Sequence, residues 1–345
     1  MPIRKYSSDE EEEEDLKEIK KINLKRPRIK YEDCPSVNSL KDLINMGKAH
    51  KYYKNINMIM LWSILPHLEE LDNMIGMKNL KETILFQIIY YLQDMHLKNR
   101  NEEYLHTVIF GSPGTGKTSV SQIIGNIYKN LGVLSKNIFK IAHRDDFVAE
   151  YLGQTAIKTK KFLKSCIGGV LFIDEAYSLG PGKKDSDSFS KEAIDTLCSF
   201  LSEHKNDFCC IIAGYENEIK QCFFSVNPGL ERRFPWSHKI DEYDEKDLTQ
   251  IFKKMINEMK WTIDSKIDEK FLNNFFKENK NEFKNFGGDV ETFISKIKIT
   301  HSKRVFGLEN KFKFIISIED FNNAYDIVKL HKMVKERKIE YSYYT

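Results

Sequence analysis

The sequence predicts an α/β fold in which a parallel sheet with helices on both faces is followed by a smaller helical domain. Between residues 107 and 240, short apolar segments alternate with amphipathic segments of helical spacing, which is typical of strand–helix–strand units. The segment Val170–Ile173 is apolar throughout, as expected of a strand covered on both faces. After Asp241 the strand pattern fades and helical spacing continues, so we expect a helical domain there.

Each element follows from its own segment. The expected strands are Thr107–Phe110, Ile138–Ala142, Val170–Asp174, Phe208–Ala213 and the less regular Trp236–Ile240. The expected helices between them are Thr118–Leu131, Thr155–Cys166, Ser190–His204 and Glu218–Val226. The chain of 345 residues is thereby divided into a disordered tail (1–35), a helical extension (36–65), a sheet domain (66–240), a helical domain (241–335) and a C-terminal tail (336–345).

The N-terminal tail is set apart by its charges. Residues 9–15 are all acidic, and a basic cluster follows between Lys20 and Lys30. Blocks of like charge repel and bury no core, so they indicate disorder. The basic cluster has two interpretations, a nuclear-import or nucleic-acid patch and, favoured here, a solvated tail. The whole chain carries a net charge of only +3, which does not favour a dedicated nucleic-acid-binding protein.

Membrane and secreted proteins are disfavoured by the apolar pattern. The apolar run Met58–Leu65 is too short to span a bilayer, and no signal peptide is recognisable at the N-terminus. The six cysteines include no C-x-x-C pair, which indicates reduced thiols rather than disulfides or a zinc site. We therefore expect a soluble cytoplasmic or other intracellular protein without a membrane partner, with a nuclear location as an alternative.

A phosphate-binding motif is the strongest chemical signal. The segment fits G-x-x-x-x-G-K-[ST] between an expected strand and an expected helix, and its residues are Gly111, Ser112, Pro113, Gly114, Thr115, Gly116, Lys117 and Thr118. Glycines let backbone N–H groups turn toward phosphate oxygens, and the start of the following helix adds a positive field. Lys117 can reach the β- and γ-phosphates, and the Thr118 hydroxyl can bind Mg²⁺. The motif predicts a P-loop NTPase that binds ATP and Mg²⁺.

Two carboxylates follow the strand Val170–Ile173. At the carboxyl edge of such a sheet, where ligands bind, Asp174 is placed to hold Mg²⁺ and Glu175 to activate the attacking water. Tyr215 follows the next strand along the chain. It is a candidate sensor of the γ-phosphate, although a tyrosine that only packs at a strand end explains the pattern equally well.

An arginine pair follows the Pro228–Gly229 turn. Arg232 and Arg233 are either surface charges or an arginine finger, which would neutralise transition-state charge on the phosphates of a neighbouring subunit.

Together these motifs resemble those of the AAA+ ATPases, and within them the CfxQ/CbbX group of red-type rubisco activases and their relatives. The similar segments, in the order of the family, are Leu71–Met77, Tyr151–Thr159, Gly168–Tyr177, Ile212–Tyr215 and Asn227–Leu230. The resemblance spans roughly residues 66–330 and implies a RecA-like αβα nucleotide-binding domain followed by a helical lid.

The resemblance also implies roles for single residues. Ile75 and Gly76 would line the adenine pocket, and Tyr151 would be the pore-loop aromatic that pulls on a client protein, with packing at a helix entrance as its alternative. Arg233 would be the finger, with Arg232 as the alternative. Family members form hexameric rings with ATP between subunits, so we expect a homo-oligomer.

One departure from the family lies in the lid. Many AAA+ lids carry an arginine that contacts the γ-phosphate, but the matching stretch here is Gly287-Gly288-Asp289-Val290-Glu291, which has the glycines and lacks the arginine. Lys296 is the nearest basic residue, and we do not assign it that role. The sequence therefore predicts a Mg²⁺-dependent ATPase that remodels an unidentified protein client through a ring. The alternatives are a nucleic-acid motor or loader, which the near-neutral charge disfavours, and a nucleotide-gated scaffold with negligible hydrolysis.

Overall fold

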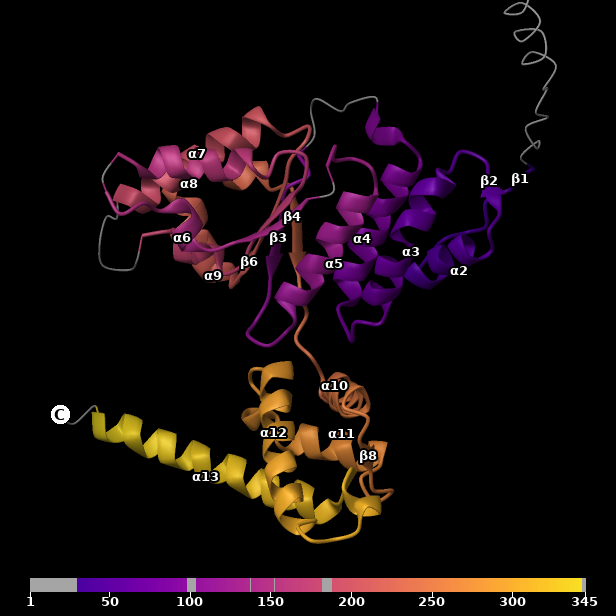
Figure 1. Ribbon diagram of the computed structural model, residues 1–345, viewed down its shortest axis with the longest axis vertical. Helices are drawn as coiled ribbons and strands as arrows, with labels where there is room; N and C mark the ends of the chain where they lie inside the picture. Colours follow the sequence, from indigo (N-terminus) through magenta and orange to yellow (C-terminus); the bar gives the residue numbers. More distant parts are fainter. Residues whose placement is uncertain (1–29, 98–103, 137, 152, 182–187, 343–345) are drawn as a thin grey trace, which may run out of the picture.

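The computed structural model describes residues 30–97, 104–136, 138–151, 153–181 and 188–342, with side chains described as far as residue 330. Its centre is a parallel sheet of five strands in the order β4-β5-β6-β3-β7 (Figure 1). The strands are β3 (Thr107–Phe110), β4 (Phe139–Ala142), β5 (Val170–Ile173), β6 (Cys209–Gly214) and β7 (Trp236–Lys239). The expected α/β fold is confirmed, and each expected strand is present with its ends displaced by no more than one residue.

Helices cover both faces of this sheet (Figure 1). One face carries α3 (Met58–Asp72), α4 (Lys78–Leu92) and α5 (Lys117–Asn130), and the other carries α7 (Thr155–Lys164) and α8 (Ser188–Glu203). Successive strand residues point to opposite faces. Within β5, Phe172 therefore joins the core beneath α5, while Leu171 and Ile173 join the core beneath α8. This double burial explains why β5 is apolar at every position.

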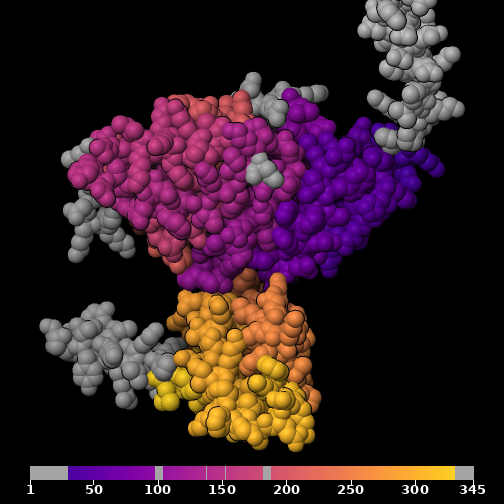
Figure 2. Space-filling view, viewed as in Figure 1, coloured from indigo at the N-terminus to yellow at the C-terminus, as the bar shows by residue number. Residues whose placement is uncertain are grey.

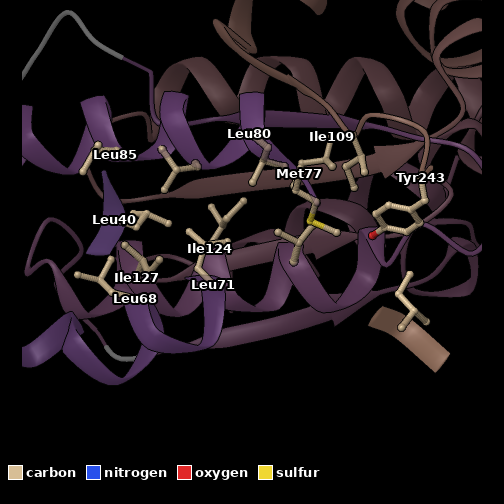
Figure 3. Close-up of a cluster of buried hydrophobic side chains, with 14 of the residues drawn as sticks. Leu40, Leu68, Leu71, Met77, Leu80, Leu85, Ile109, Ile124, Ile127 and Tyr243 are labelled. Atoms are coloured by element: carbon tan, nitrogen blue, oxygen red, sulfur yellow. The ribbon is translucent and has the colours of Figure 1, made fainter. Parts of the chain in front are cut away.

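The N-terminal helices are part of the sheet domain's core. Leu40 from α2 (Leu40–Lys48) and Leu68 and Leu71 from α3 lie with Leu80 and Ile124 in one buried cluster (Figure 3). The helix α3 runs through the boundary that we expected between residues 65 and 66. The extension and the sheet domain thus share a hydrophobic core.

Ordered structure begins before residue 36, contrary to our expectation of a tail through residue 35. Tyr31–Glu32 (β1) pairs in parallel with Tyr52–Tyr53 (β2). The Tyr52 ring lies 6.2 Å from that of Tyr31 and 5.2 Å from that of Trp62. These aromatic contacts stabilise strands that are too short to give a sequence pattern. The rest of the expected tail, including the acidic run, lies in residues 1–29, outside the described residues.

The expected helix Glu218–Val226 was also wrong in detail. The structure has a short α9 (Glu216–Glu218), a π turn (Ile219–Phe223) and a 3-10 turn (Phe224–Val226). Phe223 and Phe224 are both buried. The widened turn lets two consecutive aromatic side chains point inward, which the regular α-helical period does not favour.

Four longer helices form the lid, namely α10 (Glu245–Glu258), α11 (Glu269–Glu278), α12 (Gly287–Arg304) and α13 (Ile318–Ser342). Figure 2 shows the lid as a narrower body beside the sheet domain. The Phe293 ring packs against Phe252, Phe275 and Phe321 in its core. A short parallel pair, β8 (Thr262–Ile263) with β9 (Ile315–Ile316), was not expected. The expected boundary at 335/336 falls inside α13.

Short elements complete the described chain. They are α6 (Arg144–Phe147) and the 3-10 turns Met95–Leu97, Ala176–Leu179, Glu231–Arg233, Lys280–Glu282 and Asn310–Phe312. No helix in the described ranges has the length and apolar character needed to cross a bilayer. Cys166, Cys198, Cys209 and Cys210 are buried, and all six thiols are free.

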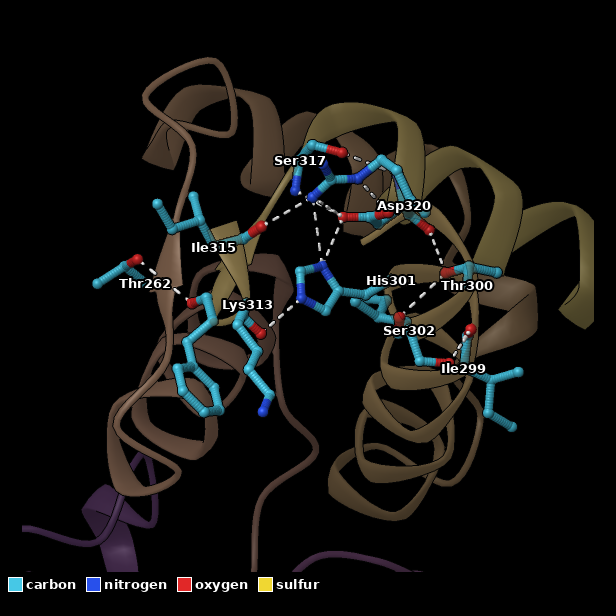
Figure 4. A network of polar contacts seen from close by, with 12 residues as sticks. Thr262, Ile299, Thr300, His301, Ser302, Lys313, Ile315, Ser317 and Asp320 are labelled. Atoms are coloured by element: carbon cyan, nitrogen blue, oxygen red, sulfur yellow. Dashed lines mark hydrogen bonds and ion pairs between the residues drawn. The ribbon is translucent and has the colours of Figure 1, made fainter. Parts of the chain in front are cut away.

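A buried ionic network joins α12 to α13 (Figure 4). Arg304 donates two hydrogen bonds to the Asp320 carboxylate, at 2.8 and 2.9 Å, and His301 Nδ1 lies 3.0 Å from it. Burial acts to raise the pKa of Asp320, but hydrogen bonds from Arg304, Ser317 and His301 outweigh it and lower the pKa to about 2. This network holds α12 and α13 of the lid together.

The lid touches the phosphate-binding loop through main-chain atoms. The Gly287 N–H at the start of α12 donates to the Gly114 carbonyl at 3.1 Å. A Cβ atom on Gly114 would lie 1.9 Å from the Asn285 carbonyl oxygen, and Gly114 has φ +68°. Both the close approach and the left-handed backbone therefore require glycine at this position.

Gly114→Ala should weaken the contact between the two domains. Gly307→Ala is the matched control, because Gly307 has φ +79° but nothing within 4 Å of its Cβ position. Both variants pay the left-handed cost of about 1–2 kcal/mol. Gly114→Ala should lose on the order of 1 kcal/mol or more beyond this in urea unfolding. Equal losses would show that the contact contributes nothing to stability.

Two buried histidines should make stability depend on pH. Burial lowers the pKa of both His106 and His238 from 6.5 to about 4. Below pH 6.5 both histidines become protonated in the unfolded chain, whereas in the native protein they stay neutral down to about pH 4. The free energy of unfolding should therefore fall by about 2 kcal/mol per histidine between pH 7 and pH 5.

His238→Leu tests this directly. Neither ring nitrogen of His238 has a hydrogen-bond partner among the described residues, so leucine removes the titration without breaking a bond. Urea unfolding at pH 7 and pH 5 should show a loss about 2 kcal/mol smaller than that of the wild type. The same loss in both proteins would contradict the prediction.

Candidate functional site

The phosphate-binding loop connects β3 to α5 at the carboxyl edge of the sheet. Gly114 (φ +68°) and Gly116 (φ +80°) both have left-handed backbones, and Gly116 caps the start of α5. The Thr115 hydroxyl donates to the Ser112 carbonyl at 2.8 Å inside the loop. Two left-handed glycines before a helix N-terminus form the concave set of N–H groups that suits phosphate oxygens.

Lys117 lies across this loop. Its Nζ donates to the carbonyls of Gly111, at 3.0 Å, and Ser112, at 2.9 Å. Burial lowers the pKa of Lys117, while the nearby charges of Asp174 and Glu175 act to raise it. The structure thus brings the expected phosphate-binding lysine and both expected carboxylates together.

The two expected magnesium ligands are in direct contact. Thr118 Oγ1 donates to Asp174 Oδ2 at 2.6 Å, and Asp174 Oδ1 accepts from the Glu175 N–H at 3.0 Å. A hydroxyl oxygen beside a carboxylate is the donor set that Mg²⁺ prefers when phosphates supply further ligands. The residues therefore fit a magnesium nucleotide.

Glu175 occupies an unusual backbone conformation. Its φ is +48°, which is uncommon for a residue with a side chain and marks sites where the surrounding structure imposes strain. Glu175 directly follows Asp174 and is exposed to solvent. The carboxylate thus stands at the sheet edge, next to the loop and in reach of solvent.

Tyr215 lies where the sequence placed it, at the end of β6. Lys117 Nζ is 4.8 Å from the centroid of the Tyr215 ring. The Tyr215 ring also stacks on that of Tyr177, with centroids 5.6 Å apart. No motif in the sequence assigns a role to Tyr177, although it lies only two residues after Glu175.

The expected adenine-pocket segment adjoins the loop. Gly76 has φ +68°, and its Cβ position lies 2.9 Å from the Tyr243 ring. The Tyr243 hydroxyl donates to the Thr115 carbonyl at 2.9 Å, and burial raises the pKa of Tyr243 to about 12. Ile75 is half-buried in this segment. Sequence reasoning missed Tyr243, because it lies in an acidic connection without regular spacing.

The two arginines differ in their contacts. Arg233 Nε donates to Ser202 Oγ on α8 at 2.6 Å, and its Nη1 donates to the Gly229 carbonyl. Arg232 is exposed. The turn is also anchored to α8, since Asn227 Nδ2 donates to Asp195 at 2.8 Å. The structure therefore holds Arg233 on α8 instead of at its own phosphate-binding loop.

Tyr151 is an exposed aromatic. Its residue is 66% exposed, and Ile157 on α7 is 70% exposed nearby in the sequence. Such exposure does not fit a tyrosine that only packs at a helix entrance. The adjacent Leu152 lies outside the described residues, as do residues 182–187 of the loop after β5.

No arginine occupies the lid position where many AAA+ proteins have one. The matching stretch is Gly287-Gly288-Asp289-Val290-Glu291, in which the Asp289 carboxylate accepts from the Asn285 N–H at 2.7 Å. This hydrogen bond lies at the start of α12, next to the contact between Gly287 and Gly114. Lys296 lies two turns further along the helix.

Comparison with known proteins agrees with this geometry. Residues 107–235 match the model of the ATPase family associated with various cellular activities (AAA). A CfxQ-like protein of Acanthamoeba polyphaga mimivirus is 38% identical over 286 residues, which are 81% of this chain and 69% of that protein. A chloroplastic ribulose bisphosphate carboxylase/oxygenase activase of Cyanidioschyzon merolae is 32% identical, over 71% of this chain and 84% of that protein.

A solved structure shows the same fold. The AAA domain of FIGL-1, in complex with ADP, superposes with a TM-score of 0.55 at 16% identity, over 74% of this chain and 83% of that chain. The family match and the two relatives agree with the motifs in the chain and with the parallel sheet that carries them. The chain belongs to the AAA+ ATPases, within their CfxQ/CbbX-like group.

Proposed function

We propose that this protein binds ATP with Mg²⁺ at residues 111–118 and hydrolyses it, and that a ring of its copies uses the hydrolysis to remodel a protein client. The hydrogen bond between Thr118 and Asp174, beside Lys117, carries the proposal. It joins both halves of a magnesium-nucleotide site that lie far apart in the sequence.

Each group in the site has a task that follows from its position. The loop N–H groups and Lys117 bind the phosphates, while Thr118 and Asp174 hold Mg²⁺. When bound, Mg²⁺ neutralises charge on the phosphate oxygens. Glu175 orients a water molecule for in-line attack and accepts its proton. Ile75 and Gly76, with Tyr243 against them, adjoin the base, and Tyr215 contacts the lysine on the γ-phosphate side.

The proposed ring of subunits depends on residues that lie outside this phosphate site. We assign the arginine finger to Arg233, with Arg232 as the alternative, because arginines on one subunit can complete the phosphate site of another. The exposed Tyr151 supports a role in contacting a polypeptide in the pore. We assign no particular client protein, because the name of the activase among the relatives gives a target for that protein alone.

Lys117→Ala should abolish ATP binding, because it removes the positive charge that lies across the loop. Glu175→Gln should keep ATP binding but lose hydrolysis, because glutamine cannot accept the proton. Equilibrium binding of a fluorescent ATP analogue and phosphate release measure the two effects. Wild-type affinity in Lys117→Ala would contradict the phosphate-site assignment.

Arg233→Ala should lower turnover on the order of a thousandfold while sparing ATP binding. The solution mass of Glu175→Gln, measured with and without Mg-ATP, should shift from a monomer to a ring of about six copies. Arg232→Ala is the matched comparison. If it alone loses turnover, the finger is Arg232, and a mass that stays monomeric with ATP bound excludes a finger shared between subunits.

One observation favours a second function, a nucleotide-gated scaffold that hydrolyses ATP negligibly. The lid stretch Gly287-Gly288-Asp289-Val290-Glu291 contains no arginine that could contact the γ-phosphate. Phosphate release by the wild type decides between the two, because a scaffold would not exceed the Glu175→Gln background.

A further inference from the structure

The connection between α3 and α4 contains a strained turn. Gly76, with φ +68°, and Met77, with φ +57°, are consecutive residues with left-handed backbones, and the Met77 side chain is buried. A residue with a side chain rarely adopts this conformation, and it persists only where the surrounding structure imposes it. The contacts around the turn must therefore hold it in place.

Three consecutive carbonyls just before this turn accept hydrogen bonds from lysines. Lys81 Nζ, on α4, donates to the Asp72 carbonyl at 2.9 Å and also to the Met74 carbonyl. Lys254 Nζ, on the lid helix α10, donates to the Asn73 carbonyl at 3.3 Å. Carbonyls at the end of a helix lack partners within the helix and carry its negative pole, so ammonium groups suit them. The end of α3 is thus held from two sides.

Lys81 contacts the chain both before and after the turn. Its side chain binds the Asp72 and Met74 carbonyls, and its own N–H donates to the Met77 carbonyl at 2.9 Å. Lys81 is half-buried. Hydrogen bonds from an ionised donor are stronger than neutral ones, and partial shielding from water strengthens them further. This one residue therefore clamps the turn at both of its ends.

The clamped turn adjoins the phosphate-binding loop. The Cβ position of Gly116 lies 3.4 Å from Met74 Cε and 3.5 Å from Met77 Cε. On the other side of the turn, the Cβ position of Gly76 lies 2.9 Å from the Tyr243 ring. The turn therefore packs where the loop passes into α5, beside the N–H groups that suit phosphate oxygens.

The main chain of Ile75, within this turn, is available to a ligand. Among the residues that the structure describes, neither its N–H nor its carbonyl has a hydrogen-bond partner, although Ile75 is half-buried. Main-chain groups that lie away from bulk solvent are nearly always paired. An unpaired donor and acceptor on one residue, next to the phosphate-binding loop, fit the polar edge of a nucleotide base.

We propose that Lys81 is a positioning residue for the nucleoside half of the site, which holds the strained turn so that the Ile75 main chain can bind the base. Lys254 adds a hold on the same segment from the lid. The inference rests on the proposed function, because it requires a nucleotide whose phosphates are bound by residues 111–118. Without the ammonium group the turn relaxes, and binding of the base must first restore it, which lowers affinity.

Lys81→Met in the full chain keeps the apolar stem and removes the ammonium group. We expect its affinity for ADP to fall ten- to a hundredfold. Its affinity for inorganic pyrophosphate, which has two phosphates and no nucleoside, should change less than twofold. Titration calorimetry in the presence of Mg²⁺ measures both. In turnover assays the KM for ATP should rise in proportion to the lost affinity, while kcat stays within twofold of the wild type.

Two further lysine variants bracket this result. Lys51→Met is the matched control, because Lys51 is exposed and donates to Glu32 at 2.8 Å in the N-terminal extension, so its variant should keep wild-type affinity for ADP. Lys254 is also exposed and reaches a single carbonyl, so Lys254→Met should lower the affinity for ADP only about threefold. Unchanged affinity in Lys254→Met would overturn the part assigned to the lid.

The pyrophosphate measurement separates positioning from a merely structural role. Equal losses for ADP and pyrophosphate in Lys81→Met would show that Lys81 only supports the fold, and unchanged affinity for ADP would show that it does not act on the turn. A fall in kcat with an unchanged KM would likewise overturn the proposal, because a residue that positions only the base acts on binding.

The wild type and Lys117→Ala separate this inference from the proposed function. Lys117→Ala should lose pyrophosphate as well as ADP, because it removes a charge from the phosphate half. A wild type that binds ADP no more tightly than pyrophosphate would overturn the nucleoside site and leave the phosphate site standing. A wild type that binds neither ligand would instead refute the proposed function itself.

Discussion

The contact between the Thr118 hydroxyl and the Asp174 carboxylate, at 2.6 Å, depends on the order of the sheet. Thr118 belongs to the helix after β3, and Asp174 ends β5. The two strands are separated only by β6, and in a parallel sheet all carboxyl ends meet at one edge. The double-sided burial that holds the strands in register therefore also determines where the phosphate site lies.

The same edge explains the position of the lid. The Gly287 N–H reaches the Gly114 carbonyl, while Tyr243 bonds to Thr115 from the connection between the domains. The phosphate-binding loop is thus contacted by the start of α12 and by Tyr243, and its Lys117 contacts the Tyr215 ring. Changes in this loop are passed on through packed groups that have little room to adjust.

Local patterns predicted the fold well, and they predicted that Thr118 and Asp174 lie at the same edge of the sheet. Apolar strands such as Val170–Ile173 and the glycine-rich loop depend on near neighbours in the sequence, so their signals are strong. Contacts that depend on tertiary structure were missed. Tyr31 pairs across twenty residues, Tyr243 reaches Thr115 across more than a hundred, and the Tyr177 ring stacks on that of Tyr215 after the neighbouring strand β6. The anchoring of Arg233 to Ser202 is likewise invisible in a linear motif.

The contact between the lid and the phosphate-binding loop is made by backbone atoms on both sides, and this has a consequence for how the lid can vary. The amide of Gly287 and the carbonyl of Gly114 persist through any exchange of lid side chains that preserves the helix start. The junction can therefore stay the same while the lid surface changes during evolution.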